Sequence, residues 1–197
     1  MEKKEVLFLF TDYWADWEVG QAMAQISFSG DYIVKTISID KEAKVSVGGL
    51  RAEIDYSLDE YQKLDNLAML VLVGSGAWRS SPYDEIADFV RRLRAIDIPV
   101  TAICGATVFL ARHGFLNNVK HTSNSLEFFQ ERLEGIDKYT GWEHYTVAQA
   151  VNDGGIITAN ETAALEFARE IMLALIEDDE GKGFANFWYE KHKKGSV

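Results

Sequence analysis

Cysteine and proline are scarce in this chain, which has one Cys and two Pro among 197 residues. A single Cys excludes an intramolecular disulfide and also a zinc or redox site of the C-x-x-C type. The scarcity of proline, together with the lack of a Ser/Gly-rich linker, an internal repeat or a low-complexity tract, predicts one domain over residues 1–197. With 47% hydrophobic residues, the chain can bury a full core.

A basic surface is also lacking, because the formal net charge is −11. This argues against nucleic acid as a partner, since phosphates require a basic face. No apolar run is long enough to cross a membrane and no cleavable signal is found, so we expect no membrane partner and a soluble, cytoplasmic protein. The four His residues show no metal-ligand spacing, and we predict neither a metal nor another cofactor.

Short apolar runs alternate with segments of helical periodicity. The runs lie at residues 6–10, 32–39, 67–73 and 98–103, with weaker ones at 147–150 and 156–158. Continuous apolar strands joined by helices are typical of a parallel sheet covered on both faces. The sequence therefore predicts an α/β three-layer sandwich with residues 67–73 as the central strand and a small hairpin at 45–54.

Helix ends are predicted from capping residues. Asp16 is expected to cap a helix that stops at Gly30. Residues 57–60 fit a capping box that opens a short helix, and Ser81 followed by Pro82 fits the start of a helix that runs to about residue 96. Another short helix is expected from about Ser125, and residues 162–176 and 184–193 are the remaining predicted helices of the C-terminal part.

The single Cys104 lies in V-T-A-I-C-G-A-T, where an apolar strand meets a helix. A residue on such a turn is presented above the sheet edge, and Ala102 and Ala106 supply the small neighbours that a tight turn requires. The helix N-terminus favours a thiolate, which indicates a nucleophile with a lowered pKa. The alternative is a buried free cysteine that packs as a small hydrophobic residue.

Three predicted strands place polar or small residues at their carboxyl ends, where ligands bind in parallel sheets. These ends are residues 10–12, 74–76 and 104–105. The pair Gly74-x-Gly76 lacks the third glycine of a nucleotide loop, because Arg79 stands there. Trp78 lines the same crevice or belongs to the core, and His144 lies in a loop over the crevice or in a packed surface segment.

The order of four motifs resembles the ThiJ/PfpI family of the class I glutamine amidotransferase-like superfamily, which includes the parkinsonism-associated protein deglycase. The motifs are V-L-F-L-F-T-D followed by Glu18, L-V-L-V-G-S-G, V-T-A-I-C-G-A-T, and D-G-G-I-I-T-A-N-E-T-A-A-L-E-F-A-R-E. The resemblance implies a flavodoxin-like sandwich and usually a homodimer.

The resemblance also assigns roles to residues. Cys104 falls on the nucleophilic cysteine and Glu18 on the acid that hydrogen-bonds it, with the backbone N–H groups of Ser75 and Gly105 as an oxyanion hole. Gly105 stands where peptidase-like members have His, and Asn124 stands where many members have Tyr or His. The late H-x-E pair of true glutamine amidotransferases is also missing, so that activity is not expected.

Three functions fit these residues. The first is a small cysteine-dependent hydrolase or reactive-carbonyl detoxifying enzyme that acts on small molecules, of the amidase, glyoxalase or deglycase kind. The second is a non-catalytic stress protein that senses oxidation at Cys104. The third is a dimeric binding module in which the site is vestigial. For each of these functions, the residues that we expect to line the pocket are Gly74, Gly76, Trp78, Asn124 and His144.

Overall fold

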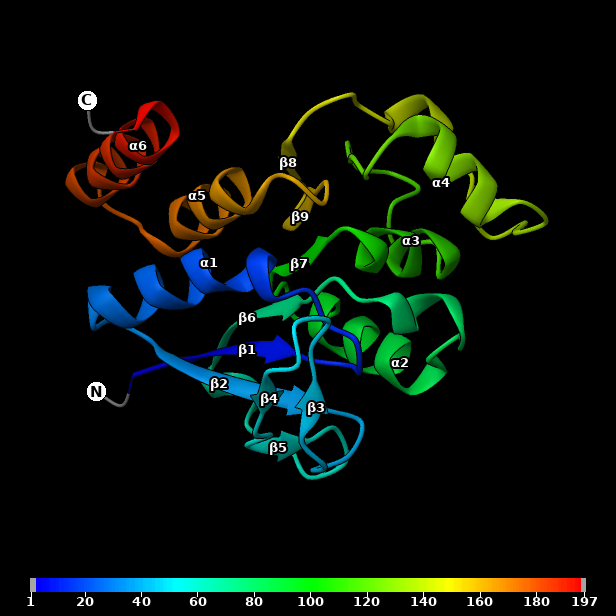
Figure 1. Cartoon of the computed structure of the whole chain (residues 1–197), viewed down its shortest axis with the longest axis horizontal. Helices are drawn as coiled ribbons and strands as arrows, with labels where there is room; N and C mark the ends of the chain where they lie inside the picture. Colours follow the sequence, from blue (N-terminus) through cyan, green and yellow to red (C-terminus); the bar gives the residue numbers. More distant parts are fainter. Residues whose placement is uncertain (1–2, 196–197) are drawn as a thin grey trace.

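The computed structural model describes residues 3–195 and contains a seven-stranded sheet between two layers of helices (Figure 1). The strands are β1 (Glu5–Leu9), β2 (Ile33–Ser38), β3 (Lys44–Val45), β4 (Arg51–Ala52), β5 (Tyr56–Ser57), β6 (Leu67–Leu72), β7 (Val100–Ile103), β8 (Ala150–Asp153) and β9 (Ile156–Ala159). The α-helices are α1 (Asp16–Ser29), α2 (Asp84–Arg94), α3 (Gly105–Arg112), α4 (Leu126–Leu133), α5 (Ala164–Leu175) and α6 (Asp179–Lys194). Short 3-10 turns are η1 (Leu64–Asn66), η2 (Gly76–Arg79) and η3 (Trp142–His144).

The strand order is β5-β2-β1-β6-β7-β9-β8, and only β8 runs antiparallel within this sheet. The predicted α/β sandwich is therefore confirmed, and β6, which contains residues 67–72, is the central strand. The chain leaves β1 toward β2 on one side and returns to β6 on the other, so the strand order reverses between β1 and β6. Crevices at such a switch point are where open α/β sheets bind ligands.

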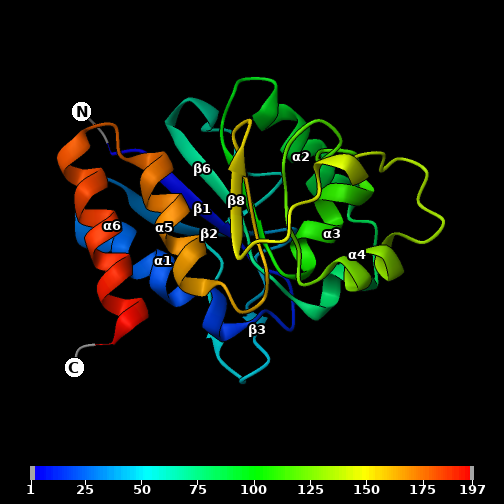
Figure 2. The same cartoon turned by 90° about the horizontal axis from the view of Figure 1, so that it is seen from above.

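The two faces of the sheet form separate apolar cores because strand side chains alternate. Leu7 and Leu9 point to the face that carries α2, α3 and α4. Val6 and Phe8 point to the face that carries α1, α5 and α6. Viewed from above, α6 is the outermost element of its layer and packs on α5 (Figure 2). None of the helices within residues 3–195 is long and apolar enough to cross a membrane.

Most predicted elements occur, and several glycine and serine ends are confirmed. Gly30 ends α1 in the left-handed conformation, with φ of 73°. Ser125 caps α4 by accepting from the Phe128 N–H group. The predicted hairpin consists of β3 and β4. The late strands β8 and β9 form a second hairpin that turns at two left-handed glycines, Gly154 and Gly155.

Four predicted helix starts are wrong. The terminal helix begins at Asp179 and not at residue 184. Asp16 is not the N-cap, which is Ala15; its carboxylate instead accepts hydrogen bonds from Ser46 and Gly48 of the β3–β4 hairpin. Residues 57–60 open no helix, because Ser57 belongs to β5 and pairs with β2. Ser81 and Pro82 also precede their helix, which begins at Asp84.

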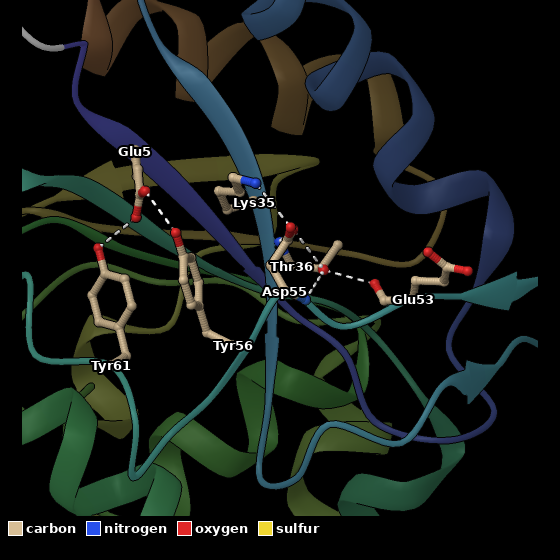
Figure 3. Close-up of polar contacts among 7 residues, drawn as sticks. All are labelled: Glu5, Lys35, Thr36, Glu53, Asp55, Tyr56 and Tyr61. Carbon is tan, nitrogen blue, oxygen red and sulfur yellow. Dashed lines mark hydrogen bonds and ion pairs between the residues drawn. The ribbon is translucent and has the colours of Figure 1, made fainter.

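The short edge strand β5 is attached to the sheet by side-chain polar contacts (Figure 3). The Tyr56 and Tyr61 hydroxyls both donate to the buried carboxylate of Glu5, at 2.9 and 3.0 Å. Asp55, directly before β5, accepts from Lys35 and from the Thr36 N–H group of β2 in more exposed contacts. These contacts compensate for the small number of backbone bonds in a two-residue strand.

Candidate functional site

Cys104 occupies a strained turn between β7 and α3. Its φ and ψ angles are 57° and −126°, a conformation that non-glycine residues rarely adopt and that is found mainly at functional sites. The Cys104 N–H group donates to Ala159 of β9, and its carbonyl accepts from the Thr107 N–H and hydroxyl groups. This is the strand-to-helix turn that the sequence predicts.

Two glycines make room for this turn. A Cβ atom at Gly105 would lie 2.9 Å from the Ser75 carbonyl oxygen, so a side chain there would displace backbone. A Cβ atom at Gly74 would overlap the carboxyl group of Glu18. A side chain at position 105 would therefore require the turn after β6 to move away from the start of α3.

Glu18 projects from the first turn of α1 and is fully buried, with 0% of its surface exposed. Burial raises the pKa of this carboxyl group to about 8, although contacts to the Cys104 thiol and the Gly74 backbone lower it. Neither carboxyl oxygen has a partner with standard hydrogen-bond geometry among residues 3–195. Burial therefore favours the neutral form of Glu18, in which its proton is available to an adjacent group.

The thiol of Cys104 is half-buried, and its pKa differs from the sequence-based expectation. Burial raises the pKa of Cys104 to about 12, and the charge of an ionised Glu18 acts in the same direction. The Asn124 amide and the Gly105 N–H group lower it, but by less. The helix N-terminus thus does not by itself produce the thiolate that we expected, because desolvation outweighs it.

Asn124 lies beside the sulfur and is held in place by Glu161. The Asn124 amide nitrogen is 3.4 Å from Sγ of Cys104 and donates to the Glu161 carboxylate at 2.8 Å. The Asn124 oxygen accepts from the Glu161 backbone N–H at 3.1 Å. A carboxylate cannot donate and an N–H cannot accept, so the two contacts fix the amide with its NH₂ toward the sulfur.

Glu161 is the residue that sequence reasoning missed. It lies between β9 and α5, and its carbonyl accepts from the Trp17 indole at 3.0 Å. The available signal is its place in the T-A-N-E-T segment of the fourth family motif, at the carboxyl end of a strand.

Ser75 lies on the turn after β6. Its hydroxyl accepts from the Ala77 N–H and shares a 2.6 Å hydrogen bond with Thr11, which follows β1. Gly74 and Gly76 pair with the segment around Trp14, which leaves the Ser75 N–H outside that ladder. The carboxyl ends of β1, β6 and β7 therefore meet at the switch point, as the topology predicts.

The other candidate residues take different places. Trp78 is 2% exposed, donates to the Val73 carbonyl and belongs to the core rather than to a pocket wall. Gly76 opens η2 beside the Tyr13 side chain. No hydrogen bond within residues 3–195 joins His144 to Cys104, and its ring lies 3.7 Å from Glu143. No group of three His, Cys, Asp or Glu residues within the same range is suited to hold a metal ion.

Comparison with known proteins agrees with this fold. The DJ-1/PfpI family model matches residues 4–174. The chain is 32% identical to the "Uncharacterized protease YdeA" of Bacillus subtilis over 186 residues, which cover 94% of this chain and 90% of that protein.

Solved structures give the same result. A thiJ/pfpI family protein from Bacillus anthracis is 32% identical with a TM-score of 0.82, covering 98% of this chain and 92% of that chain. A DJ-1 superfamily protein from Agrobacterium tumefaciens is 28% identical with a TM-score of 0.83, covering 96% of this chain and 99% of that chain. The chain belongs to the DJ-1/PfpI family.

Proposed function

We propose that this protein is a cysteine-dependent enzyme that acts on small carbonyl compounds, either by hydrolysing amides or by converting reactive aldehydes. The observation that carries the proposal is the pairing of Cys104, on a strained turn, with Glu18, a buried acid whose pKa is raised to about 8. Perturbed titratable groups of this kind gather at catalytic sites. The name of the relative from Bacillus subtilis, an uncharacterized protease, is consistent with a hydrolase.

In the proposed mechanism, one proton moves between Glu18 and Cys104. A carboxylate beside a thiol and a carboxylic acid beside a thiolate differ only in the position of that proton, so the pair titrates as a unit. The thiolate of Cys104 attacks the carbonyl carbon, and the carbonyl electron pair moves to the oxygen. The N–H groups of Ser75 and Gly105 stabilise this oxyanion. With an amide, the C–N bond breaks as Glu18 gives its proton to the leaving amine, which leaves a thioester on Cys104. Water then cleaves the C–S bond and gives one proton to Glu18, which releases the carboxylic acid and restores the thiolate and the Glu18 acid. With an aldehyde, Glu18 protonates the new alkoxide to form a hemithioacetal.

The test is a panel of small amides and of aldehydes such as methylglyoxal, assayed with the wild type, Cys104→Ser and Glu18→Gln. We expect Cys104→Ser to abolish turnover and Glu18→Gln to reduce kcat by about 100-fold or more, the usual contribution of a general acid. Circular dichroism shows whether each variant is folded. Turnover by folded Cys104→Ser at the wild-type rate would refute the proposal.

An oxidation-sensing role is the second candidate, and the donors around the sulfur favour it. The Glu18 acid, the Asn124 amide and the Gly105 N–H group lie where they would stabilise a sulfinate on Cys104. Intact-mass measurement after mild peroxide treatment should then show addition of two oxygens in the wild type and less in Asn124→Ala. If the thiol stays unmodified while the protein shows turnover, only the enzymatic function is supported. Absence of both reactions would favour the binding module.

We further infer that the protein works as a cytoplasmic homodimer, with α6 at the interface. The exposed face of α6 carries Glu180, Phe184, Phe187 and Lys191, which recur at helical spacing. The two Phe side chains are 57% and 66% exposed, an unusual amount for aromatic residues. A second copy in antiparallel orientation would cover both and place each Glu180 opposite Lys191 of the other copy.

A further inference from the structure

Because burial favours the neutral form of Glu18, the charge beside Cys104 is that of Glu161, which acts on the thiol and on Glu18. The Glu161 side chain is exposed, and no Lys, Arg or His within residues 3–195 forms an ion pair with it. Because the Asn124 amide nitrogen contacts both the Glu161 carboxylate and the sulfur, this carboxylate lies one amide group away from the reacting atom. The site therefore has an uncompensated negative charge at its solvent edge.

Exposed aromatic rings lie beside the same edge. Trp17 is 55% exposed and its indole donates to the backbone carbonyl of Glu161, which places the ring against the segment that carries this carboxylate. Tyr13 is 67% exposed and its Cβ atom borders Gly76, directly after the Ser75 turn. Tyr13 has a left-handed backbone, with φ of 59°, which is rare for an aromatic residue. Aromatic faces together with a carboxylate are the groups that proteins use to hold ammonium and guanidinium cations.

We propose that this site selects substrates that carry a positive charge near the electrophilic carbon and rejects anionic ones, with Glu161 as the residue that sets the preference. This inference rests on the proposed function of Cys104 as a nucleophile. The substrate class is then an amide or aldehyde with an amino or guanidino group, held between Glu161 and the rings of Trp17 and Tyr13. Carboxylate-bearing or phosphorylated carbonyl compounds are disfavoured.

The single cysteine allows a direct measurement without knowledge of the substrate. Three methanethiosulfonates are used, whose attached groups are trimethylammonioethyl (cationic), methyl (neutral) and sulfonatoethyl (anionic). In each reaction the Cys104 thiolate forms a disulfide with the reagent and its S–SO₂ bond breaks, releasing methanesulfinate with the electron pair. Rates are followed by intact mass and divided by the rates with N-acetylcysteine, which removes intrinsic differences between the reagents.

We expect the normalised cation-to-anion rate ratio to exceed about fivefold in the wild type. A fivefold ratio corresponds to about 1 kcal/mol, the size expected for charges a few ångströms apart at a solvated edge. Glu161→Gln keeps the acceptor for Asn124 but removes the charge, so the ratio should fall toward one. The ratio should also fall with added salt, because Glu161 is exposed. Glu131→Gln, which removes an exposed charge on α4, is the matched control and should leave the ratio unchanged.

The outcomes separate this inference from the proposed function. A ratio near one in the wild type, or an equal ratio in Glu161→Gln, overturns the inference even if the enzyme turns over amides or aldehydes. A ratio that depends on Glu161 supports the inference even if no tested carbonyl compound reacts, in which case the proposed catalysis alone fails. Uniform acceleration of all three reagents in Glu161→Gln would reflect an easier ionisation of Cys104 and leaves the ratio as the deciding quantity.

Discussion

Individual residues at the site are constrained by one another rather than by local sequence preference. Gly74 leaves the space that Glu18 fills, and Gly105 leaves the space for the Ser75 carbonyl. The buried Glu18 in turn raises the pKa of Cys104 whenever it is ionised. A neutral Glu18 is therefore the state in which this site is most compatible with a thiolate.

This coupling predicts how Glu18 affects stability with pH. The pKa of Glu18 is raised from 4.5 to about 8 in the folded protein, so the folded state binds more protons than the unfolded state between these values. The free energy of unfolding should therefore decrease as pH rises from about 4.5 to 8 and level off above. Relative to the wild type, Glu18→Gln should become more stable across this window, by an amount on the order of 5 kcal/mol at most.

Urea unfolding of both proteins at pH 5 and pH 8.5 measures this effect. Glu131→Gln controls for the loss of an exposed carboxylate and should show no such pH dependence. A difference between Glu18→Gln and the wild type that is equal at the two pH values would contradict a buried neutral acid. The groups that act on Glu18, namely the Cys104 thiol, the Gly74 backbone and the Glu161 carboxylate, are unchanged in the variant.

At this scale, the sequence was sufficient to place Cys104 on a strand-to-helix turn but not to predict its ionisation. The strand-to-helix pattern and the family motifs both indicate Cys104, and the motifs indicate Glu18 and the position of Asn124. Glu161 was missed because it acts through Asn124, which is 37 residues away along the chain. The raised pKa of Cys104 could not be predicted, because desolvation depends on packing from several elements.

Helices and strands were predicted correctly where the hydrophobic periodicity is strong. Helix starts were mispredicted where the expected capping residue makes a tertiary contact instead. Ser57 looks like the first residue of a capping box, but its strand pairs with Ser38 of β2. Asp16 looks like an N-cap, but its carboxylate ties α1 to the β3–β4 hairpin. Such tertiary contacts can override a helix cap because each cap contributes only about 1 kcal/mol to the stability of the protein.

The attachment of β5 can be tested through Tyr61. Its hydroxyl donates to the buried Glu5, and Tyr61→Phe removes this donor while the ring stays in the core. We expect the free energy of unfolding to fall by about 1.5–3 kcal/mol, the range for a hydrogen bond to a charged acceptor. Tyr13→Phe is the control, since Tyr13 is largely exposed, and it should change stability by less than about 0.5 kcal/mol. Equal stability of both variants would show that Glu5 is held by other groups.

At the scale of the whole molecule, charge is distributed along α6 in a way that suits two-fold pairing. The helix begins with Asp179 and Glu180 and ends with Lys191, Lys193 and Lys194. Its outward position in the fold leaves this gradient accessible (Figure 2). Next to it, Phe28 is 82% exposed and lines a hollow of about 900 Å³ together with Phe184, which extends the apolar surface beyond α6.

The proposed homodimer therefore predicts a charge-reversal rescue. In an antiparallel pair centred between Phe184 and Phe187, Glu180 faces Lys191 of the second copy, so Glu180→Lys or Lys191→Glu alone places like charges opposite each other. Each should weaken the dimer about fivefold or more, as expected for charge pairs worth up to about 1 kcal/mol at an exposed interface. The double variant restores both opposite-charge pairs and should recover the wild-type dissociation constant in analytical ultracentrifugation.

The control variant is Glu134→Lys, which makes the same change in net charge as Glu180→Lys but outside α6. It should leave the dissociation constant of the dimer unchanged. A wild type that sediments as a monomer, or a double variant no tighter than the singles, would mean that α6 does not form this interface.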